Sequence, residues 1–359
     1  TKETIGTGTL DEYFSFAKDV AAVDFSGWQG NDFQITKETW RDVREATRRY
    51  NQPGKFVTFL GYEWSGLTPA GGDHNIYFLN DEEEIHRSNH WLIDDRSDEA
   101  SDRYPISQLW KAYRNRRDVM AIGHVGGRYA NLDYFDPDIV PLIEVHSNHG
   151  TFEWFLEDAL RRGLKVGFIA GSDDHTCRPG LASPTGHFNS RGGYVGVYAS
   201  SLTREALWDA LKTRRCYATT GERIILWMDV NGRVMGDEFE TDTPPRIFTR
   251  ITGTAPLHEV ELKRGLETIY RHPFSKPLPG GKRLIKIEWS GARVKSRDKT
   301  VDWQGGLCLD RGKILSCSEF AFDYPGQGVR KVSEQSLEWK SVTGGDSDGV
   351  LLEVDARDE

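Results

Sequence analysis

Between Thr1 and about Gly221, segments with helical periodicity alternate with short apolar runs, and this alternation limits the fold more than any other feature. Apolar residues recur at helical spacing in residues 10–21, 40–50, 106–113 and 152–160, and in a last helix after Thr203. The runs FVTFLGYEW, HNIYFL, VMAIGHV, LIEVHS and KVGFIAGSDDH lie between helices and are typical of buried strands. Strands that alternate with helices predict parallel βαβ units, in a barrel or in an open doubly wound sheet.

The pattern changes after Gly221. RIILWMDV and RVMGDEF flank an Asn231-Gly232 turn and predict a β-hairpin, because Asn-Gly adopts the positive φ angles of a tight hairpin turn. More strand-like runs follow without an intervening helical pattern. The length of 359 residues also favours two domains. We therefore expect an α/β domain over residues 1–222 and an antiparallel β-sandwich-like domain over residues 223–359.

Charge and hydropathy exclude some partners. The formal net charge of −9 argues against a protein that binds a phosphate backbone broadly, so we expect no nucleic acid partner. A small anionic substrate remains compatible, because one or two arginines in a cleft suffice to bind it. No run reaches the ~20 apolar residues of a membrane-spanning helix, so we expect no membrane partner. The oligomeric state and the compartment stay open, with the cytoplasm slightly favoured over the periplasm.

Several potential metal ligands lie at strand ends. Glu63 is near the end of FVTFLGYEW, His124 follows VMAIG, and Asp173 and His175 close KVGFIAGSDDH. The carboxyl ends of parallel strands form the functional face of α/β folds. Asp173 and His175 are two residues apart, so in an extended segment both reach the same side. Alone, GSDDH would equally fit a polar loop with a capping aspartate. Together with Glu63 and His124 it predicts a site for divalent Zn, Mn or Fe, one to three ions in all.

Other histidines are less clear. His74 opens a strand instead of closing one, and a single strand histidine is often structural. Glu144, His146 and His149 follow one another along LIEVHSNH, and each could be a metal ligand, a group that orients a ligand, or a general acid. We take His149 and His146 as the candidate catalytic residues. His86 and His90 lie in a highly charged stretch and are expected at the surface.

Three arginines are candidates for binding an anionic substrate. Arg178 follows the Asp173/His175 motif directly, Arg128 follows GHVGG, and Arg191 lies in NSRGG. Each guanidinium could form paired hydrogen bonds with a phosphate or carboxylate. An ordinary solvated arginine is the alternative for each. Arg178 is the strongest candidate because the preceding motif sets its location.

The motifs GYEWSG, GGDHNIYF, GHVGG, IEVHSNHG, GSDDHTCRPG and YATTGERI span nearly all of residues 1–222. In this order they resemble the PHP (polymerase and histidinol phosphatase) superfamily. The resemblance implies a distorted (β/α)7 barrel with two or three metal ions, and metal-bound hydroxide that attacks a phosphate ester. It also implies a bridging role for the carboxylate of Glu63. The ligands that it implies are Glu63, His74, His124, Asp173 and His175.

Two features depart from the superfamily pattern. PHP chains open with a histidine-x-histidine strand that this sequence lacks, and we expect that strand upstream of Thr1. Gly30-Asn31-Asp32 stands where the superfamily has Thr-Asp-His, so Asp32 is a substitute metal ligand at best. The second departure weakens the transfer of a phosphatase activity.

These observations predict a metal-dependent hydrolase of a small or medium anionic ester, with phosphoesters as the leading class. Hydrolysis of a carbon–nitrogen or other non-phosphate bond by the same metal chemistry is one alternative, because a fold does not determine a substrate. A degenerate, non-catalytic barrel with a binding β domain is the other.

Overall fold

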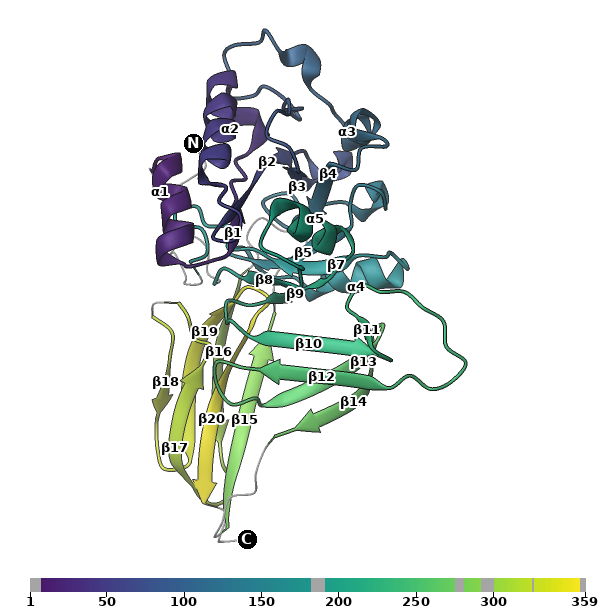
Figure 1. Ribbon diagram of the computed structural model, residues 1–359. Coiled ribbons are helices and arrows are strands. Elements are labelled where there is room, and N and C mark those ends of the chain that lie inside the picture. Colours follow the sequence, from purple (N-terminus) through teal and green to yellow (C-terminus); the bar gives the residue numbers. More distant parts are fainter. Residues whose placement is uncertain (1–7, 182–190, 275–280, 292–299, 325, 356–359) are drawn as a thin grey trace.

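Figure 1 shows the computed structural model, which describes residues 8–181, 191–274, 281–291, 300–324 and 326–355. The helices surround strands β1–β9, and strands β10–β20 form smaller sheets below them (Figure 1). No helix in these ranges is both long and apolar enough to cross a membrane. The α-helices are α1 Leu10–Ser15, α2 Lys37–Tyr50, α3 Ile106–Tyr113, α4 Glu153–Arg161 and α5 Arg204–Lys212.

The helices begin where the local sequence predicts. At α1, the Glu12 amide donates to Thr9 Oγ1 at 3.1 Å, and the Thr9 amide donates to Glu12 Oε2 at 2.7 Å, so the two residues form a capping box. The chain then continues as a π-helical turn over Phe16–Val20. A residue with a hydroxyl also caps α2, where Thr36 accepts from the Thr39 amide.

One seven-stranded sheet carries the candidate ligands. Its strands follow the order β1-β2-β3-β4-β5-β6, and β7 pairs with the other edge of β5. A separate pair, β8–β9, lies beyond β7. The bounds are β1 Phe25–Gly27, β2 Val57–Ser65, β3 Asp73–Phe78, β4 Val119–Gly123, β5 Leu142–Ser147, β6 Gly150–Thr151, β7 Gly167–Ala170, β8 Tyr194–Val197 and β9 Cys216–Thr219.

The prediction of a (β/α)7 barrel, closed and parallel, is wrong. Strands β1–β2, β4–β5 and β5–β7 are parallel, but β2–β3, β3–β4, β5–β6 and β8–β9 are antiparallel. The physical reason lies in the connection from Ser65 to Asp73, which holds only a short 3-10 turn at Thr68–Ala70. A parallel crossover needs a dozen residues or more, so β3 must run back along β2. The strands form half a barrel instead of a ring.

Side-chain alternation separates the two faces of this half-barrel. Along β4, Val119 and Ala121 pack with α2 and α3 in the outer core, while Met120 and Ile122 face inward. Helix α5 contributes Leu207 to the inner cluster near the strand starts. The outer face is therefore filled by helices, and the inner face borders a cavity.

After β9 the described residues form strands in four small sheets, in place of the single sandwich that we expected. Their orders are β11-β10-β12, β13-β14, β15-β20-β17 and β16-β19-β18, and neighbouring strands in them are antiparallel. The last two sheets share an apolar core around Ile314, Leu337 and Leu352. The bounds are β10 Ile225–Val230, β11 Arg233–Val234, β12 Ile247–Thr252, β13 Glu259–Arg264, β14 Glu267–Pro273, β15 Lys282–Ser290, β16 Val301–Cys308, β17 Lys313–Phe320, β18 Gly328–Lys331, β19 Ser336–Thr343 and β20 Ser347–Asp355.

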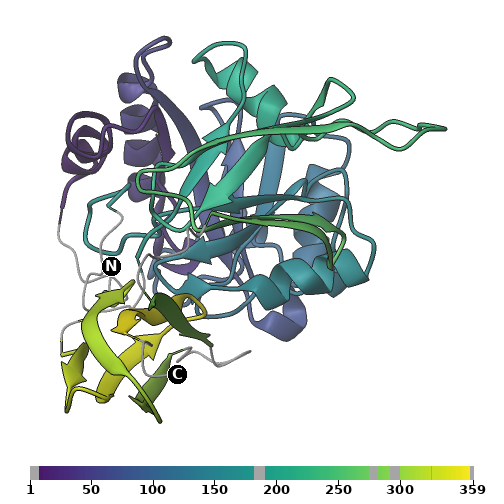
Figure 2. The ribbon, with the colours of Figure 1, turned by 90° about the horizontal axis from the view of Figure 1, so that it is seen from below.

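The later sheets also touch the half-barrel. The Thr151 amide of β6 donates to the carbonyl oxygen of Gly344 at 2.9 Å, in the turn between β19 and β20. Gly150 and Gly345 lie so close to the opposing backbone that a Cβ at either position would collide with it. Both have positive φ, which glycine adopts readily. Figure 2 shows this arrangement from below, with the yellow-green C-terminal strands beside the half-barrel.

Candidate metal centre

Three side chains form a group that could hold a metal ion. His124 follows β4, His149 follows β5 and Asp173 follows β7, so three parallel neighbouring strands bring them to one end of the sheet. Asp173 Oδ2 lies 3.5 Å from His124 Nε2 and 3.3 Å from His149 Nε2. One ligand atom from each residue lies within 4.8 Å of the others. Two imidazole nitrogens and a carboxylate form a donor set that suits zinc and related divalent ions.

The backbone at Asp173 adopts an unusual conformation that helps to place its carboxylate near the two histidines. Its φ is +45°, in the left-handed region that non-glycine residues seldom adopt. Aspartate tolerates this region better than most residues do, and conformations of this kind concentrate at functional sites. The turn at Asp173 brings the carboxylate toward His124 and His149.

Glu144 contacts the ring nitrogen of His124 that does not face Asp173. Its Oε1 lies 2.7 Å from His124 Nδ1, and both side chains are buried. Accepting from Nδ1–H leaves Nε2 of His124 facing Asp173, as in carboxylate–histidine–metal arrangements. Burial alone would lower the pKa of His124, but Glu144, Asp173 and Glu63 outweigh burial and raise that pKa to about 10. Without a metal, the carboxylates therefore keep a proton on His124, and a divalent cation would take the place of that positive charge.

His175 and His74 lie beside the group. His175 Nδ1 bonds the carbonyl oxygen of Asp173 at 2.8 Å, and its ring stands perpendicular to that of His149 with centroids 5.6 Å apart. His74 is buried, bonds the carbonyl oxygen of Gly72 through Nδ1 at 3.2 Å, and is paired in register with Gly123, directly before His124. Burial lowers the pKa of His74 to about 4, so the ring is neutral. Ligation by His74 and His175 stays a prediction.

Glu63 belongs to a neighbouring charged cluster. Asn31 Nδ2 and Ser65 Oγ each donate to Glu63 Oε1 at 2.8 Å, and an Arg128 guanidinium nitrogen lies 3.6 Å from it. Arg128 also donates from Nε and from its backbone amide to Asp73, each at 2.8 Å. The guanidinium therefore balances two carboxylates. Asp73 is fully buried, and our sequence reading missed it although it stands beside His74 in GGDH.

Asp32, the expected substitute ligand, has other partners. It is fully buried and accepts a hydrogen bond from the Ser88 hydroxyl at 3.0 Å as well as one from the Ser88 amide. Burial raises the pKa of Asp32 to about 7, although the Ser88 bonds oppose this. Its carboxylate thus holds the segment around Ser88 in place. Metal binding by Asp32 stays a prediction.

The segment after Ser88 corrects one prediction. His90 is buried, not exposed, with Nδ1 2.7 Å from Asp102 and Nε2 3.0 Å from Asp98. The buried Arg87 also contacts Asp98, at 2.8 Å. The charged residues of this stretch compensate one another inside the fold, which a count of charges along the sequence cannot reveal.

The remaining candidates lie in different surroundings. His146 is buried beside the group, and its Nδ1 contacts Thr151 Oγ1 at 2.7 Å. Arg178 is exposed and donates from Nε to Thr176 at 2.9 Å. Arg191 lies 3.2 Å from Glu222 and 3.9 Å from Asp323. The proposed catalytic and substrate-binding roles of these residues stay predictions.

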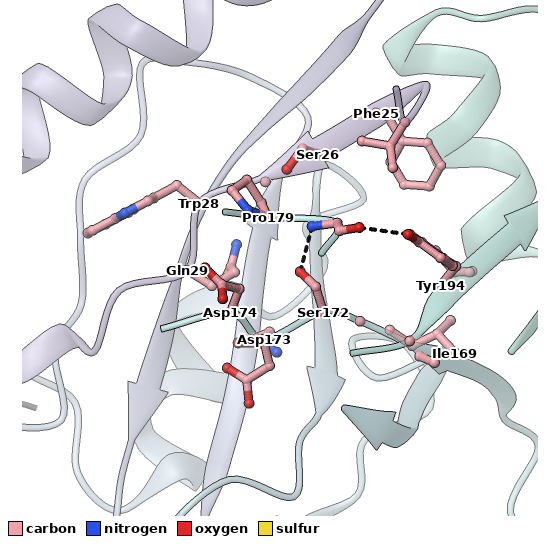
Figure 3. Close-up of a pocket in the computed structure, with 18 of the residues that line it drawn as sticks. Phe25, Ser26, Trp28, Gln29, Ile169, Ser172, Asp173, Asp174, Pro179 and Tyr194 are labelled. Atoms are coloured by element: carbon pink, nitrogen blue, oxygen red, sulfur yellow. Dashed lines mark hydrogen bonds between the residues drawn. The ribbon is translucent and has the colours of Figure 1, made fainter. Parts of the chain in front are cut away.

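A cavity of about 650 Å³ lies along the inner face of the half-barrel. Its wall includes Glu63, Glu144, Asp173 and His175, together with inward-facing residues of strands β1–β5 and β7–β9. In Figure 3, dashed lines mark two bonds that hold the loop after β7. The Gly180 amide donates to Ser172 Oγ at 2.9 Å, and Tyr194 Oη donates to the Gly180 carbonyl oxygen at 2.6 Å.

Gln29 stands out in this wall. Figure 3 labels it among the residues around Asp173 and Asp174. Both its side-chain oxygen and its side-chain nitrogen are buried without a hydrogen-bond partner in the described chain. An unsatisfied buried amide costs about 1–3 kcal/mol, so its retention at a cavity suggests a ligand that pairs with it.

The chain belongs to the family described as protein of unknown function (DUF3604), which it matches over residues 7–131 and 181–240, just over half of its length. An uncharacterised protein of Chlamydia pneumoniae is 24% identical, with the match covering 78% of this chain and 51% of that protein. For an uncharacterised protein of Chlamydia trachomatis these values are 20%, 84% and 55%. The chain thus spans about half the length of the curated relatives it matches.

One solved structure is distantly similar. It is a two-domain protein from Bacteroides vulgatus that contains a predicted PHP-like metal-dependent phosphoesterase. It is 13% identical, with a TM-score of 0.39, and the match covers 79% of this chain and 87% of that one. Similarity at this level supports no conclusion on fold or activity.

Proposed function

We propose that this chain carries the site of a metal-dependent hydrolase that acts on an anionic ester, with phosphoesters as the leading class. The observation that carries the proposal is the carboxylate of Asp173, which faces Nε2 of both His124 and His149. Carboxylate and imidazole donors at the ends of three neighbouring strands, beside a cavity large enough for a small molecule, fit this chemistry.

The chain's own residues would have distinct tasks. His124, His149 and Asp173 would hold a divalent ion, and Glu144 would keep His124 in the tautomer that presents Nε2. The ion, when bound, would supply Lewis-acid chemistry that lowers the pKa of water and stabilises charge on a leaving oxygen. His175, beside His149 and in the cavity wall, is placed to bind a further ion or to move a proton at the leaving oxygen.

The preference for an anionic substrate rests on Arg128. Its guanidinium lies between Glu63 and Asp73 at the same end of the sheet, with a quarter of its side chain exposed. A divalent ion bound near these carboxylates would leave part of that positive charge free to attract an anion. A phosphate oxygen is the ligand that such a combination of metal and arginine favours.

The test combines elemental analysis with a hydrolase panel. The purified protein is expected to contain at least about one equivalent of a divalent transition metal. It should hydrolyse a phosphomonoester or phosphodiester in a reaction that a chelator abolishes and Mn²⁺ or Zn²⁺ restores. Asp173→Asn should lose bound metal and turnover, while the matched control His272→Ala, on an exposed strand, keeps both. Turnover of amides alone would replace the phosphoester assignment by carbon–nitrogen hydrolysis. A metal-free protein without turnover would overturn the proposal.

A further inference from the structure

A second set of acidic side chains lies at one end of the C-terminal sheets, apart from His124, His149 and Asp173. Its centre is Asp348 in β20, whose inward row continues with Val350, Leu352 and Val354, all buried. Asp348 is fully buried, and neither carboxylate oxygen has a hydrogen-bond partner in the described chain. The Ser341 hydroxyl is near enough to lower the pKa of Asp348, but it is not placed to donate a well-formed hydrogen bond. A lone buried carboxylate is costly unless something pairs with it.

Two more carboxylates, those of Asp323 and Asp346, lie at the same end of this sheet. Phe320 of β17 pairs with Gly349 of β20 in antiparallel register, so the chain beyond each strand brings Asp323 toward Asp346. Asp323 keeps only 4% of its side chain exposed, and its Oδ1 has no hydrogen-bond partner. Burial and, less strongly, the charge of Asp346 raise the pKa of Asp323 to about 7, while Arg191 opposes this rise. Burial also raises the pKa of Asp348 to about 7, with Asp346 and Asp323 acting in the same direction. The three carboxylates therefore repel one another.

Among the described residues, the positive charge near these three carboxylates is too small to balance them. Arg191 Nε lies 3.9 Å from Asp323 Oδ2, but this arginine is 41% exposed and also contacts Glu222 at 3.2 Å. Within the part of the chain that the structure describes, one partly solvated guanidinium shared with a fourth carboxylate leaves net negative charge at the buried end of the sheets.

The unpaired atoms here are oxygens. Gln327, four residues after Asp323, donates from Nε2 to the carbonyl oxygen of Val342 at 3.3 Å, while its buried Oε1 has no partner. Val342 is the neighbour of Ser341 along β19, so the amide lies at the sheet that packs against the sheet of Asp348. Carboxylate and amide oxygens without imidazole or thiolate are the donors that Ca²⁺ prefers, whereas zinc sites use nitrogen and sulfur.

We propose that Asp323, Asp346 and Asp348 form a binding site for Ca²⁺ that fastens the C-terminal sheets to the half-barrel. Opposed ligands of Ca²⁺ can lie about 5 Å apart, because each bond is about 2.3–2.6 Å long, so its ligands need not be as close together as the His124 group. Asp346 Oδ1 accepts from the Gly344 amide at 2.6 Å, and Gly344 in turn accepts from Thr151 of β6 at 2.9 Å. A bound ion would thus order the turn that contacts β6, next to His146.

The register offers a direct spectroscopic test. Trp289 of β15 is the cross-strand partner of Asp348. Tb³⁺, a luminescent substitute for Ca²⁺, should therefore emit when tryptophan is excited, and Ca²⁺ should displace it. Trp289→Phe should weaken the emission while calorimetry still finds Ca²⁺ bound. Asp348→Asn should abolish both signals, whereas the exposed control Asp310→Asn should change neither.

Thermal unfolding of the whole chain completes the test. Saturating Ca²⁺ should raise the Tm of the wild type by roughly 5 °C and leave Asp348→Asn unchanged. Without Ca²⁺, Asp348→Asn should melt at or above the wild type, because it removes a buried unpaired charge. If that variant does not fold, Asp346→Asn provides the same comparison. If Ca²⁺ raises the Tm of the wild type and of the folded Asp348→Asn or Asp346→Asn variant equally, the site is overturned. The site is also overturned if Asp173→Asn loses the rise in Tm while Asp348→Asn keeps it.

Discussion

Glu144 and His124 meet with Oε1 and Nδ1 2.7 Å apart, and neither side chain is exposed by more than 7%. This contact keeps a proton on Nδ1 and directs Nε2 at Asp173. Glu144 was one of three residues along LIEVHSNH whose role the sequence left open between metal ligand, orienting partner and acid. The geometry supports the orienting role.

Replacing Glu144 by glutamine should therefore weaken metal binding without removing it. The amide oxygen can still accept from Nδ1, but the negative charge that makes the imidazole a stronger ligand is lost. We expect the metal affinity to fall by about 10- to 100-fold in a chelator-competition titration. Glu205→Gln, at an exposed position of α5, is the control and should bind as the wild type does. Unchanged affinity in Glu144→Gln would show that this carboxylate does not act on the metal.

Arg128 should contribute strongly to stability in the metal-free protein. Burial and Glu63 raise the pKa of Asp73 to about 7, and Arg128 opposes that rise. Arg128→Met leaves Asp73 buried beside a second carboxylate, which should cost about 3–5 kcal/mol in the free energy of unfolding. Denaturant titration of the chelator-treated protein measures this loss of stability.

The double variant Arg128→Met/Asp73→Asn tests the cause, because it removes the charge that Arg128 compensates. It should recover most of the lost stability. If the double variant loses as much free energy of unfolding as the two single variants together, Arg128 stabilises the fold through packing and not through its charge.

Gln29 should affect substrate binding more than folding. Gln29→Leu removes two buried polar atoms that have no partner, so the variant should be as stable as the wild type or more so. If the amide recognises the substrate, KM should rise by about 10-fold with little change in kcat. Steady-state kinetics on the substrate found by the panel, with the exposed Gln52→Leu as control, provide the measurement. Lower stability together with normal KM would contradict this role.

His146 should make the fold sensitive to acid. Burial lowers the pKa of His146 to about 4, below the 6.5 of an ordinary histidine. Between these values the unfolded chain binds a proton that the native chain does not, so stability falls as the pH falls through this window. The loss should be about 1.4 kcal/mol for each pH unit.

Unfolding by denaturant at pH 7.5 and pH 4.5 isolates this effect. The wild type should lose about 2–3 kcal/mol more than His146→Asn over this interval, and the exposed control His272→Asn should lose as much as the wild type. A slope that His146→Asn leaves unchanged would assign the acid sensitivity to other groups.

The sequence alone determined much of the local structure. Helices at residues 106–113 and after Thr203 follow from apolar spacing, and α3 and α5 lie at these positions. The sequence also predicted where β4 and β7 end, and it therefore predicted that His124 and Asp173 lie at strand ends. These features depend on periods of a few residues, because side-chain direction in a helix or strand follows from the backbone itself.

Only the tertiary structure decided how these pieces pair. The short connection before Asp73 reverses β3 and leaves half a barrel, and Arg128 pairs with Asp73 across 55 positions of sequence. Asp348 reads as a polar residue in an acidic tail, yet it is buried at the end of an apolar row. Strand direction and charge pairing depend on contacts between segments that are distant in the sequence. A local sequence pattern gives no information on the energies of these contacts. A sequence therefore identifies the groups that can do chemistry, whereas the fold decides which charged groups lie close enough to pair.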